Sequence, residues 1–348
     1  MTKLLARGLA KGAVGIACLG AAFVALGNAV GAERFWLLAF VQYLPYPIHL
    51  APALLACLCS LALGRLWRLA ALAALVLVVW PVMGLELHAR EPARGRPSVR
   101  VMTYNIKASL AALRPDGFAR LAREVITHDP DILIAQDAHE HAATRRLVPS
   151  SSDAVYGTRQ RYAWGQYTIA SRYSLRDCAP GRTATGQPSD AFIRCTVDIR
   201  GTLVDVFAVH LRTPRQALVA TRREALDGID DLQQNVADRM AQARDVALAV
   251  RASTRPVILG GDLNAPEASL VVRSLLDVGL RDAFSSAGAG YGYTYGHSLP
   301  RPGFSFLRID HVLVGPQFGV ADCTVGGADA SQHRPVIADL LLGAVGAP

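Results

Sequence analysis

The apolar residues of this chain follow two different patterns. Long, almost uncharged stretches fill the first ninety residues, whereas short apolar runs alternate with polar segments over the rest. The stretches 12–32 and 69–87 are each long enough to cross a bilayer as a helix. The segment 48–64 between them is also apolar, and Pro45, Pro47 and Pro52 shape its beginning. The pattern predicts a membrane region at residues 1–90 with three transmembrane helices.

A cleaved signal peptide followed by two helices is the alternative, because Lys3, Arg7 and Lys11 precede the first apolar segment. That segment is long for a signal peptide, and two more apolar segments follow it, which favours three helices. Basic residues before the first helix, and Arg65 and Arg68 between the second and third, predict cytoplasmic flanks. An odd number of spans then places the C-terminal domain of a multi-pass cell-membrane protein outside the cytoplasm.

The remainder of the chain alternates between strand-like and helical patterns. Residues 91–97 combine proline, glycine and charge, which is typical of a linker, and a globular domain is expected at 98–345. Strands are expected at Val99–Tyr104, Asp131–Ala135, Leu203–Val209, Pro256–Leu259, Ile309–Val314 and Val336–Leu341, and helices at Asp116–Thr127, within 215–251 and at Ala268–Val278. This alternation predicts an α/β or α+β sandwich of sheets covered by helices.

Charge and cysteines add two constraints. The net charge of +8 is spread thinly, without a dense basic tract. It favours a membrane surface or a phosphate-bearing partner, and nucleic acid is possible but not favoured. Cys178 and Cys195 lie near the adjoining ends of two strand-like segments, Tyr167–Leu175 and Phe192–Ile199. A disulfide in an oxidising compartment and two buried thiols are equally compatible with this spacing.

Polar residues stand at the ends of several apolar runs of the expected domain. Such a set suggests a shared metal-and-imidazole site, which is a hydrolase pattern. Its members are Asn105, Gln136 with Asp137, His210, Asp262 with Asn264, Asp310 with His311, and His333.

Two parts of this set have a definite chemistry. Asp262 and Asn264 follow a glycine pair and lie on one face, which suits a phosphate beside a hard cation, although a turn capping the next helix is the alternative. Asp310 interrupts a buried strand and needs a partner, for which His333 is the natural candidate. Together they would form an oriented general base. For His311 a hydrogen-bonded structural role is preferred.

With these motifs assembled, residues 99–342 resemble the endonuclease/exonuclease/phosphatase superfamily, whose fold is called DNase I-like. The resemblance implies two mixed β-sheets packed as a sandwich with outer helices, and cleavage of phosphate esters with Mg²⁺ or Mn²⁺. The motifs that carry it are Tyr104-Asn105, Leu133 to Asp137, Ala170 to Tyr173, Val209 to Leu211, Gly261 to Asn264, Arg308 to His311 and Ser331 to Pro335.

The resemblance also implies roles for individual residues. His333, oriented by Asp310, would act on the attacking water, and charge on the phosphoryl group would be neutralised by its surroundings. The catalytic residues implied are His333, Asp310, His210, Asp262 and Asn264, with Asn105, Asn264 and His210 binding phosphate, and with Asp137, Asn105 and Gln332 binding metal.

The metal-binding residues depart from the family pattern at two positions. Asp137 stands where the family usually has glutamate, and Gln332 stands where it usually has aspartate. One carboxylate is therefore shorter and another is replaced by a neutral amide, so we expect weaker metal affinity or a shifted metal. A catalytically impaired protein that binds phosphate ligands remains an alternative to a working hydrolase.

The three-helix anchor resembles a membrane-bound branch of this superfamily, some members of which act on lipid-linked pyrophosphate. A tethered site lies near phospholipid head groups and polyprenyl phosphates, so a lipid-linked substrate is expected and a nuclease is the alternative. Four arginines near the motif ends are candidates to hold its phosphate, although a surface charge is the favoured interpretation of each one taken alone: Arg212, Arg215, Arg301 and Arg308.

Overall fold

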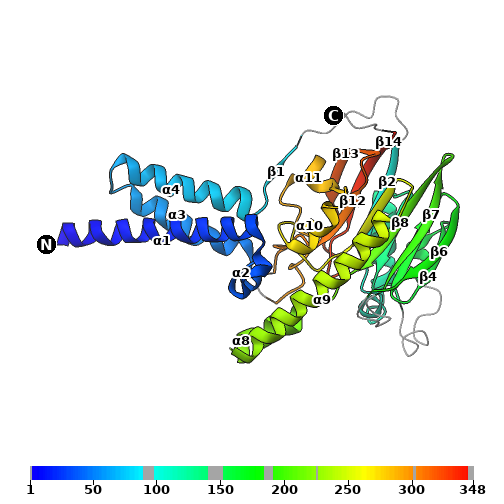
Figure 1. Ribbon diagram of the computed structural model, residues 1–348, viewed down its shortest axis with the longest axis horizontal. Helices are drawn as coiled ribbons and strands as arrows, with labels where there is room; N and C mark the ends of the chain where they lie inside the picture. The colour runs from blue at the N-terminus through cyan, green and yellow to red at the C-terminus, as the bar shows by residue number, and fades with distance from the viewer. Residues whose placement is uncertain are drawn as a thin grey trace.

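The computed structural model describes residues 2–88, 98–139, 152–183, 191–224, 226–300 and 303–343. The linker expected at 91–97 lies outside these residues. A helical region formed by the first part of the chain extends from one side of a β-sandwich formed by the rest (Figure 1). The N-terminus lies at the end of the helical region that is distant from the sandwich.

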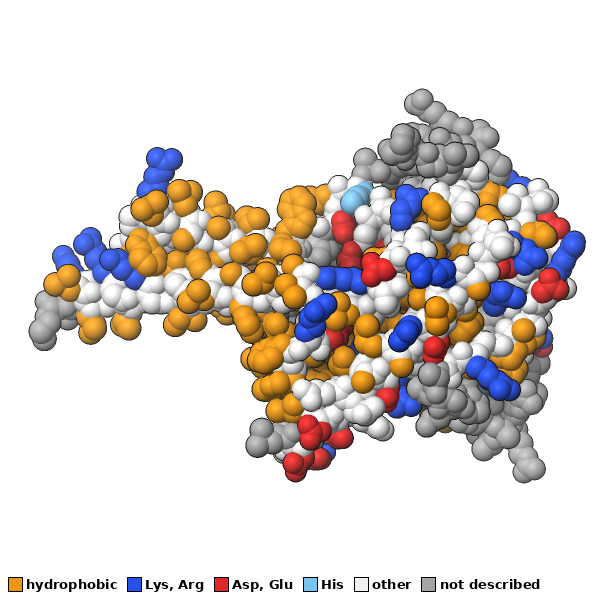
Figure 2. All heavy atoms as spheres, viewed as in Figure 1, with side chains coloured by type: hydrophobic (Ala, Val, Ile, Leu, Met, Phe, Trp, Pro, Cys, Tyr) orange, Lys and Arg blue, Asp and Glu red, His pale blue; other side chains and the backbone are white. Residues whose placement is uncertain are grey.

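The N-terminal region is a bundle of three helices with a short fourth helix against the sandwich. The long members are α1 (Thr2–Val30), α3 (Leu50–Ser60) and α4 (Arg65–Leu77), with α2 (Trp36–Val41) and the short turns η1 (Ala32–Arg34), η2 (Tyr46–His49) and η3 (Val78–Val82) between and after them. Small buried residues such as Ala17, Ala56 and Ala71 let the helices approach closely. Large apolar side chains face outward along the bundle (Figure 2).

Two of the three predicted spans have the length and composition of a membrane helix. Among the described residues these are Lys3–Val30 and Arg65–Val82. The middle helix, α3, has 11 residues. At 1.5 Å per residue this is about 16 Å, roughly half of a hydrocarbon core. The prediction of three transmembrane helices is therefore not confirmed for the middle one.

The sandwich consists of two six-stranded mixed sheets, with strand orders β10-β12-β9-β8-β7-β6 and β13-β14-β2-β3-β5-β4. The first contains β6 (Leu175–Gly181), β7 (Phe192–Ile199), β8 (Thr202–His210), β9 (Val257–Asp262), β10 (Arg281–Asp282) and β12 (Asp310–Val314). The second contains β2 (Ser98–Asn105), β3 (Ile132–Gln136), β4 (Gln160–Trp164), β5 (Tyr167–Ser171), β13 (Phe318–Val325) and β14 (Val336–Leu342). The DNase I-like fold expected from the sequence is thus confirmed. Strands β1 (Glu86–Leu87) and β11 (Ala289–Gly290) pair separately.

The central strands are buried on both faces, which explains their continuous apolar runs. Alternate residues such as Val101 and Ile258 fill the space between the sheets. Their neighbours face outward, where α9 (Leu226–Arg251) and α10 (Leu270–Leu276) cover one sheet and α6 (Gly117–His128) covers the other. The remaining helices are α5 (Ala108–Ala111), α7 (Asp153–Tyr156), α8 (Arg215–Glu224) and α11 (Ala283–Ala287).

The segment 167–175 contains one difference from the expected strands. Instead of one strand it contains the whole of β5 and the start of β6, which belong to different sheets. The hydroxyl of Ser171 accepts the backbone N–H of Tyr173 in the turn that separates them. Cys178 of β6 and Cys195 of the adjacent β7 are joined by a disulfide, so the structure contains the disulfide that the sequence left open.

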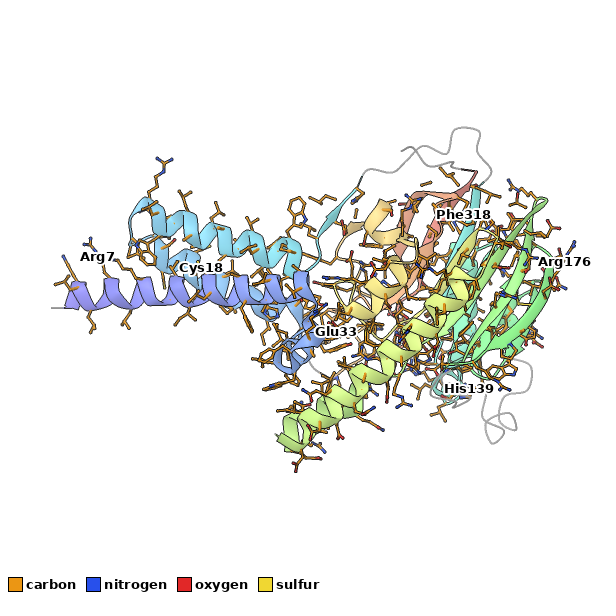
Figure 3. The ribbon with its side chains drawn as sticks, viewed as in Figure 1. Arg7, Cys18, Glu33, His139, Arg176 and Phe318 are labelled. Carbon is orange, nitrogen blue, oxygen red and sulfur yellow. A yellow bond between two sulfur atoms is a disulfide. The ribbon has the colours of Figure 1, made fainter. Side chains whose placement is uncertain are left out.

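The helical region is bonded to the sandwich through several polar contacts. Glu33 lies at the junction of the two parts (Figure 3), where its Oε2 accepts the backbone N–H of Leu270 at 3.1 Å. The Arg273 guanidinium donates to the carbonyl of Ala29 at 2.7 Å, and the Tyr293 hydroxyl donates to that of Met83 at 2.9 Å. The N-terminal region is therefore packed against the sandwich.

Candidate active site

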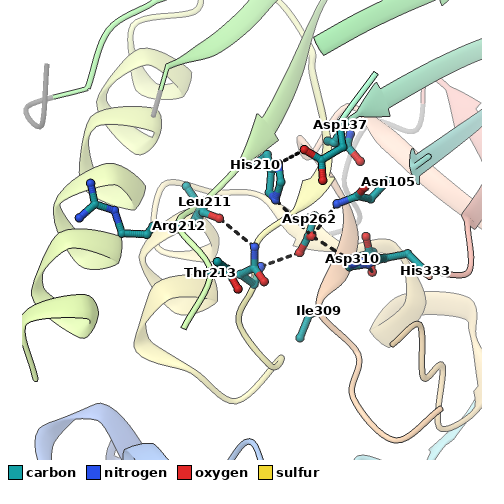
Figure 4. Close-up of polar contacts among 12 residues, drawn as sticks. Asn105, Asp137, His210, Leu211, Arg212, Thr213, Asp262, Ile309, Asp310 and His333 are labelled. Atoms are coloured by element: carbon teal, nitrogen blue, oxygen red, sulfur yellow. Dashed lines mark hydrogen bonds and ion pairs between the residues drawn. The ribbon is translucent and has the colours of Figure 1, made fainter. Parts of the chain in front are cut away.

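The ends of five strands bring polar side chains to one edge of the sandwich. Strands β8 and β9 are parallel, with His210 opposite Asp262, and the antiparallel β12 places Asp310 on the other side of Asp262. In the second sheet, the parallel strands β2 and β3 end with Asn105 opposite Gln136. Because the sheets pack face to face, side chains from both meet in one cluster (Figure 4).

Two glycines allow β9 to approach its neighbours closely. An added Cβ at Gly260 would lie 2.7 Å from the Cδ1 atom of Ile134 in the facing sheet. At Gly261 it would lie 2.0 Å from the carbonyl oxygen of Val209 in the adjacent strand. Any larger side chain would therefore displace the strand end that carries Asp262.

His333 and Asp310 form an oriented imidazole–carboxylate pair. Nδ1 of His333 lies 2.9 Å from Oδ2 of Asp310, and both residues are buried. With Nδ1 donating to the carboxylate, Nε2 is the free ring nitrogen, 3.7 Å from Oδ2 of Asp262. Burial lowers the pKa of His333, but the carboxylates of Asp310 and Asp262 outweigh it and the pKa is raised. Such a ring can accept a proton from water.

Asp262 is the centre of the cluster. Its Oδ2 accepts from the side-chain amide of Asn105 at 2.9 Å, and its Oδ1 accepts the backbone N–H of Asn264 at 2.9 Å. Asn264 has a left-handed backbone with φ of 48°, and its side-chain amide donates to the carbonyl of Leu211 at 2.8 Å. The amide expected to hold phosphate therefore also fixes the turn after β8.

His210 is held by a residue from another loop. Its Nδ1 lies 2.6 Å from Oε1 of Gln166, so with the amide oxygen accepting, Nδ1 carries a proton. Its Nε2 lies 3.4 Å from Oδ2 of Asp262. To donate to a phosphoryl oxygen from Nε2 as well, the ring has to carry a second proton.

Asp137 faces a lysine. The ammonium of Lys107 forms an ion pair with Oδ2 of Asp137, and Nδ1 of His210 lies 3.8 Å from Oδ1. Burial raises the pKa of Asp137, but His210 and Lys107 outweigh it and lower the pKa to about 2. The backbone N–H of Lys107 also donates to Oδ1 of Asn105 at 3.3 Å. Gln332 lines the cavity beside this group.

A cavity of about 870 Å³ lies over these groups. Its polar end is lined by Lys107, Asp137, His210, Asp262, Asn264, Gln332 and His333, and its apolar wall by Leu218, Val219, Leu299, Phe306, Leu307 and Ile309. Arg212 and Arg215 also line it, together with Tyr43 from the N-terminal region. Space of this kind suits a ligand with a charged end and an apolar body.

Arg308 and His311 belong to a different network. The Arg308 guanidinium donates to both carboxylate oxygens of Asp282 at 2.9 and 3.0 Å, and Nδ1 of His311 lies 2.8 Å from Asp282. Successive side chains of a strand face opposite sides, so His311 points away from the face of Asp310. The expectation that Arg308 holds phosphate is wrong, whereas the structural role of His311 agrees with these contacts. Arg301 lies outside the described residues.

The donor atoms fit a divalent cation at one position better than at another. Asp262, Asp310 and His333 offer ligand atoms within 4.8 Å of one another. Oδ1 of Asp310 is buried and has no hydrogen-bond partner in the described part of the chain. By contrast, oxygens of Asp137 and Asn105 already accept from one lysine. A cation held by the first group would supply positive charge beside a phosphate.

The sequence interpretation missed four residues of the site: Lys107, Gln166, Tyr43 and Tyr295. The ring of Tyr295 packs on His333 with centroids 4.9 Å apart. Tyr295 lies in a segment rich in glycine and tyrosine, residues 288–296, which is its one signal in the sequence. Gln166 lies in a turn between strands, and Tyr43 lies in the helical region. Neither has a local pattern that connects it with the strand ends.

Comparisons with known proteins agree with this architecture. The model of a family described as Endonuclease/Exonuclease/phosphatase matches residues 102–333. An endonuclease/exonuclease/phosphatase from Beutenbergia cavernae is similar in structure, at 25% identity and a TM-score of 0.50, over 71% of this chain and 72% of that chain.

Two further solved structures resemble the fold. A family protein from Bacteroides thetaiotaomicron has 18% identity and a TM-score of 0.54, over 71% of this chain and 98% of that chain. Truncated Caenorhabditis elegans TDP2 has 19% identity and a TM-score of 0.51, over 70% and 98%. A search of curated proteins gave no significant match. At these identities the two structures support the fold alone.

Proposed function

Because the chain belongs to the endonuclease/exonuclease/phosphatase family, we propose that it is a membrane-anchored, divalent-metal-dependent phosphohydrolase. Its substrate is a lipid-linked phosphate ester or pyrophosphate, cleaved outside the cytoplasm. The fold is that of phosphoesterases and nucleases. The proposal that the substrate is lipid-linked rests on one observation: groups suited to phosphate chemistry share a cavity with an apolar wall.

The proposed reaction is attack of water on phosphorus, which forms a P–O bond to the water oxygen and breaks the P–O bond to the alcohol or phosphate that leaves with the electron pair. Nε2 of His333 takes the proton from the water while Asp310 holds the ring and stabilises the imidazolium that forms. Asp262 and Asn264 place the water and a phosphoryl oxygen, and His210 neutralises charge that develops on the phosphate. A divalent ion held by the carboxylates of Asp262 and Asp310 would supply further positive charge and leave Nε2 of His333 free for the proton.

The position of the cavity supports a substrate with a lipid chain. Leu218 of its wall also packs in the apolar cluster of Ala39 from α2 and Leu232 from α9. The cavity therefore reaches the contact between the helical region and the sandwich, where Tyr43 lines it. An acyl or prenyl chain of a lipid can be buried against such a wall at a gain of about 0.8 kcal/mol per CH₂ group.

The outer surface of the helical region supports the membrane anchor. Side chains such as Leu19 and Leu72 are more than half exposed on α1 and α4, and apolar atoms dominate this surface in Figure 2. Most basic side chains of the region gather at the end that is distant from the sandwich, whereas Arg34 lies in η1 near the junction. By the positive-inside rule that end is cytoplasmic, which places the catalytic domain on the opposite side of the membrane.

Two of the cavity arginines weaken the alternative of a nuclease. Arg212 is paired with Asp238, and Arg215 donates to the hydroxyl of Tyr295 at 2.8 Å. A duplex needs several phosphate contacts for tight binding. The apolar wall of the same cavity is better suited to a lipid chain than to a nucleic-acid backbone.

The test uses the full-length protein in lipid nanodiscs with Mg²⁺ or Mn²⁺. Phosphate release is measured from polyprenyl pyrophosphate and from inorganic pyrophosphate, alongside nicking of plasmid DNA. Asp262→Ala and His333→Ala should abolish release from the lipid substrate. His128→Ala is the matched control, because His128 also contacts a carboxylate, at 3.0 Å, but does not line the cavity. Equal background in all four proteins would refute the enzyme, and DNA nicking alone would establish the nuclease.

Val219→Asp separates lipid recognition from chemistry. It places a charge on the apolar wall of the cavity and should raise KM for the polyprenyl substrate while leaving turnover of the soluble substrate unchanged. Leu248→Asp, on the exposed face of α9, is the control for added charge. If Val219→Asp and Leu248→Asp behave alike toward both substrates, the apolar wall does not hold a lipid.

A further inference from the structure

Lys107 is an unusual residue in this chain. The other two lysines, Lys3 and Lys11, lie near the start of α1, and every later basic residue except Lys107 is arginine. An ammonium is a compact point charge, whereas a guanidinium is a planar fork. The one lysine beyond the helical region lies at the candidate active site, two residues after Asn105.

The side chain of Lys107 is placed at the oxygens expected to hold a metal. Its ammonium forms an ion pair with Oδ2 of Asp137, and its backbone N–H donates to Oδ1 of Asn105 at 3.3 Å. The side chain is three-quarters buried, with 25% exposure, and it lines the cavity. One residue thus engages two of the three predicted metal ligands.

The backbone fixes this arrangement. The N–H of Ile106 donates to the carbonyl of Gln136 at 3.0 Å, and that of Ala108 donates to the carbonyl of Asp137 at 2.8 Å. Lys107 and Asp137 both adopt left-handed backbone conformations, with φ of 46° and 47°, which non-glycine residues adopt at a cost of about 1 kcal/mol or more. Two strained residues held by two hydrogen bonds indicate a pre-formed ion pair.

The charges of Asp137 and Lys107 cancel each other without a metal ion. Asp137 contributes one negative charge and Lys107 one positive charge, while Asn105 and Gln332 are neutral. A hard divalent ion needs several oxygen ligands and gains affinity from their negative charge. Beside Asp137 such an ion would meet a carboxylate already paired with the Lys107 ammonium, and that ammonium would repel it. The next carboxylate, that of Asp262, is already bonded to the Asn105 amide.

We propose that the Lys107 ammonium occupies the cation position beside Asp137 and Asn105. It takes the place of a divalent ion there and faces the phosphate of the bound substrate. The second half of this proposal rests on the function proposed above. A divalent ion, when present, would bind beside the carboxylates of Asp262 and Asp310 instead. Lys107 is then a phosphate-binding residue that no metal can replace without displacing its side chain.

Titration with Mn²⁺, followed by electron paramagnetic resonance on the full-length protein, tests the first half without any substrate. Lys107→Met removes the ammonium and should create an additional Mn²⁺ site, or tighten binding by more than about tenfold. Asp137→Asn added to Lys107→Met should abolish that gain. Lys107→Arg keeps the positive charge, although not the compact shape of the ammonium, and should therefore still exclude Mn²⁺ from Asp137. If Lys107→Met leaves Mn²⁺ binding unchanged, the proposal is wrong.

A second variant covers the case in which Lys107→Met does not fold. Asp137→Asn in the otherwise wild-type protein should leave Mn²⁺ binding unchanged, because Asp137 holds the lysine rather than the metal. Loss of the Mn²⁺ signal in this variant would overturn the proposal.

Binding of inorganic phosphate, measured by calorimetry, tests the second half. Lys107→Met should weaken it by about tenfold, and Lys107→Arg should preserve it; equal affinity in Lys107→Met and wild type would refute phosphate binding by Lys107. If no substrate is hydrolysed but the Mn²⁺ results hold, the proposed function fails while the ammonium at the cation position stands.

Discussion

Replacement of Tyr43 by phenylalanine removes a single oxygen through which the N-terminal region contacts the site. The Tyr43 hydroxyl donates to the backbone carbonyl of Asn264 at 2.9 Å and accepts from the guanidinium of Arg239. Arg239 is fully buried and also donates to the Asn264 carbonyl, at 3.0 Å. The hydroxyl therefore helps to hold Asn264, the residue with a left-handed backbone two positions after Asp262.

The size of the effect follows from these contacts. A hydrogen bond to a charged group contributes about 1.5–3 kcal/mol. Tyr43→Phe loses this bond and the bond to Asn264, but Arg239 still holds the carbonyl. A displaced Asn264 would stabilise the transition state less well. If about half of the lost hydrogen-bond free energy is lost from the transition state in this way, the activation barrier rises by roughly 1.4 kcal/mol and kcat falls about tenfold. KM should change by less than about threefold, because the apolar wall is untouched.

The assay compares kcat and KM of the full-length protein in nanodiscs with those of two variants. Tyr293→Phe is the matched control, because Tyr293 also joins the sandwich to the helical region, through the carbonyl of Met83 at 2.9 Å, without touching Asn264. Both variants should lose thermal stability, Tyr43→Phe more than Tyr293→Phe because it also loses the bond from Arg239, but only Tyr43→Phe should lose kcat. Equal loss of kcat in both, or in neither, would refute the argument that Tyr43 positions Asn264.

Three further predictions follow from the fold and the site. His333 must be neutral to act as a base, and its pKa is raised above 6.5 because the carboxylates of Asp310 and Asp262 outweigh the effect of burial. The rate should therefore increase with pH through a pKa above that value, and Asp310→Asn should move this increase to lower pH. Reduction of the Cys178–Cys195 disulfide, which spans 17 residues, should cost about 3 kcal/mol, seen as a lower unfolding midpoint in dithiothreitol; an unchanged midpoint would contradict this. Gly261→Ala should destabilise the protein by more than about 3 kcal/mol, measured by denaturant unfolding, because its Cβ would meet a carbonyl at 2.0 Å.

The strands that carry the site could be predicted because their apolar runs are continuous. Strands β3 and β9 are buried along their whole length and are apolar or glycine until the polar end. Strands β2 and β8 are buried over most of their length, and their last four residues before the polar end are mostly apolar. Strand β4 could not be predicted in the same way: it reads Gln-Arg-Tyr-Ala-Trp and alternates between exposed and half-buried positions at a sheet edge. Edge strands have too little burial to impose a pattern.

The contact between the helical region and the site could not be predicted. Apolar composition identifies a helix that avoids water, but the same composition suits a bilayer and a packed bundle. Tyr43 and Asn264 are separated by 221 positions along the chain, and nothing local to either residue indicates the other. A domain boundary drawn from composition alone separates two segments that share a cavity.

The chemistry around Asp137 and Gln332 likewise depends on a contact that the sequence does not indicate. Taken one at a time along the sequence, a shorter carboxylate at Asp137 and an amide at Gln332 each indicate a weakened metal site. Lys107 carries no signal in that view, because a lysine after a strand is ordinarily a solvated charge. Once its ammonium is placed on Asp137, the loss of negative charge has a counterpart in a gain of positive charge. Asp137, Gln332 and Lys107 then form a group in which the negative charge of Asp137 is neutralised by an ammonium and needs no divalent ion. Such a group differs chemically from a defective metal site.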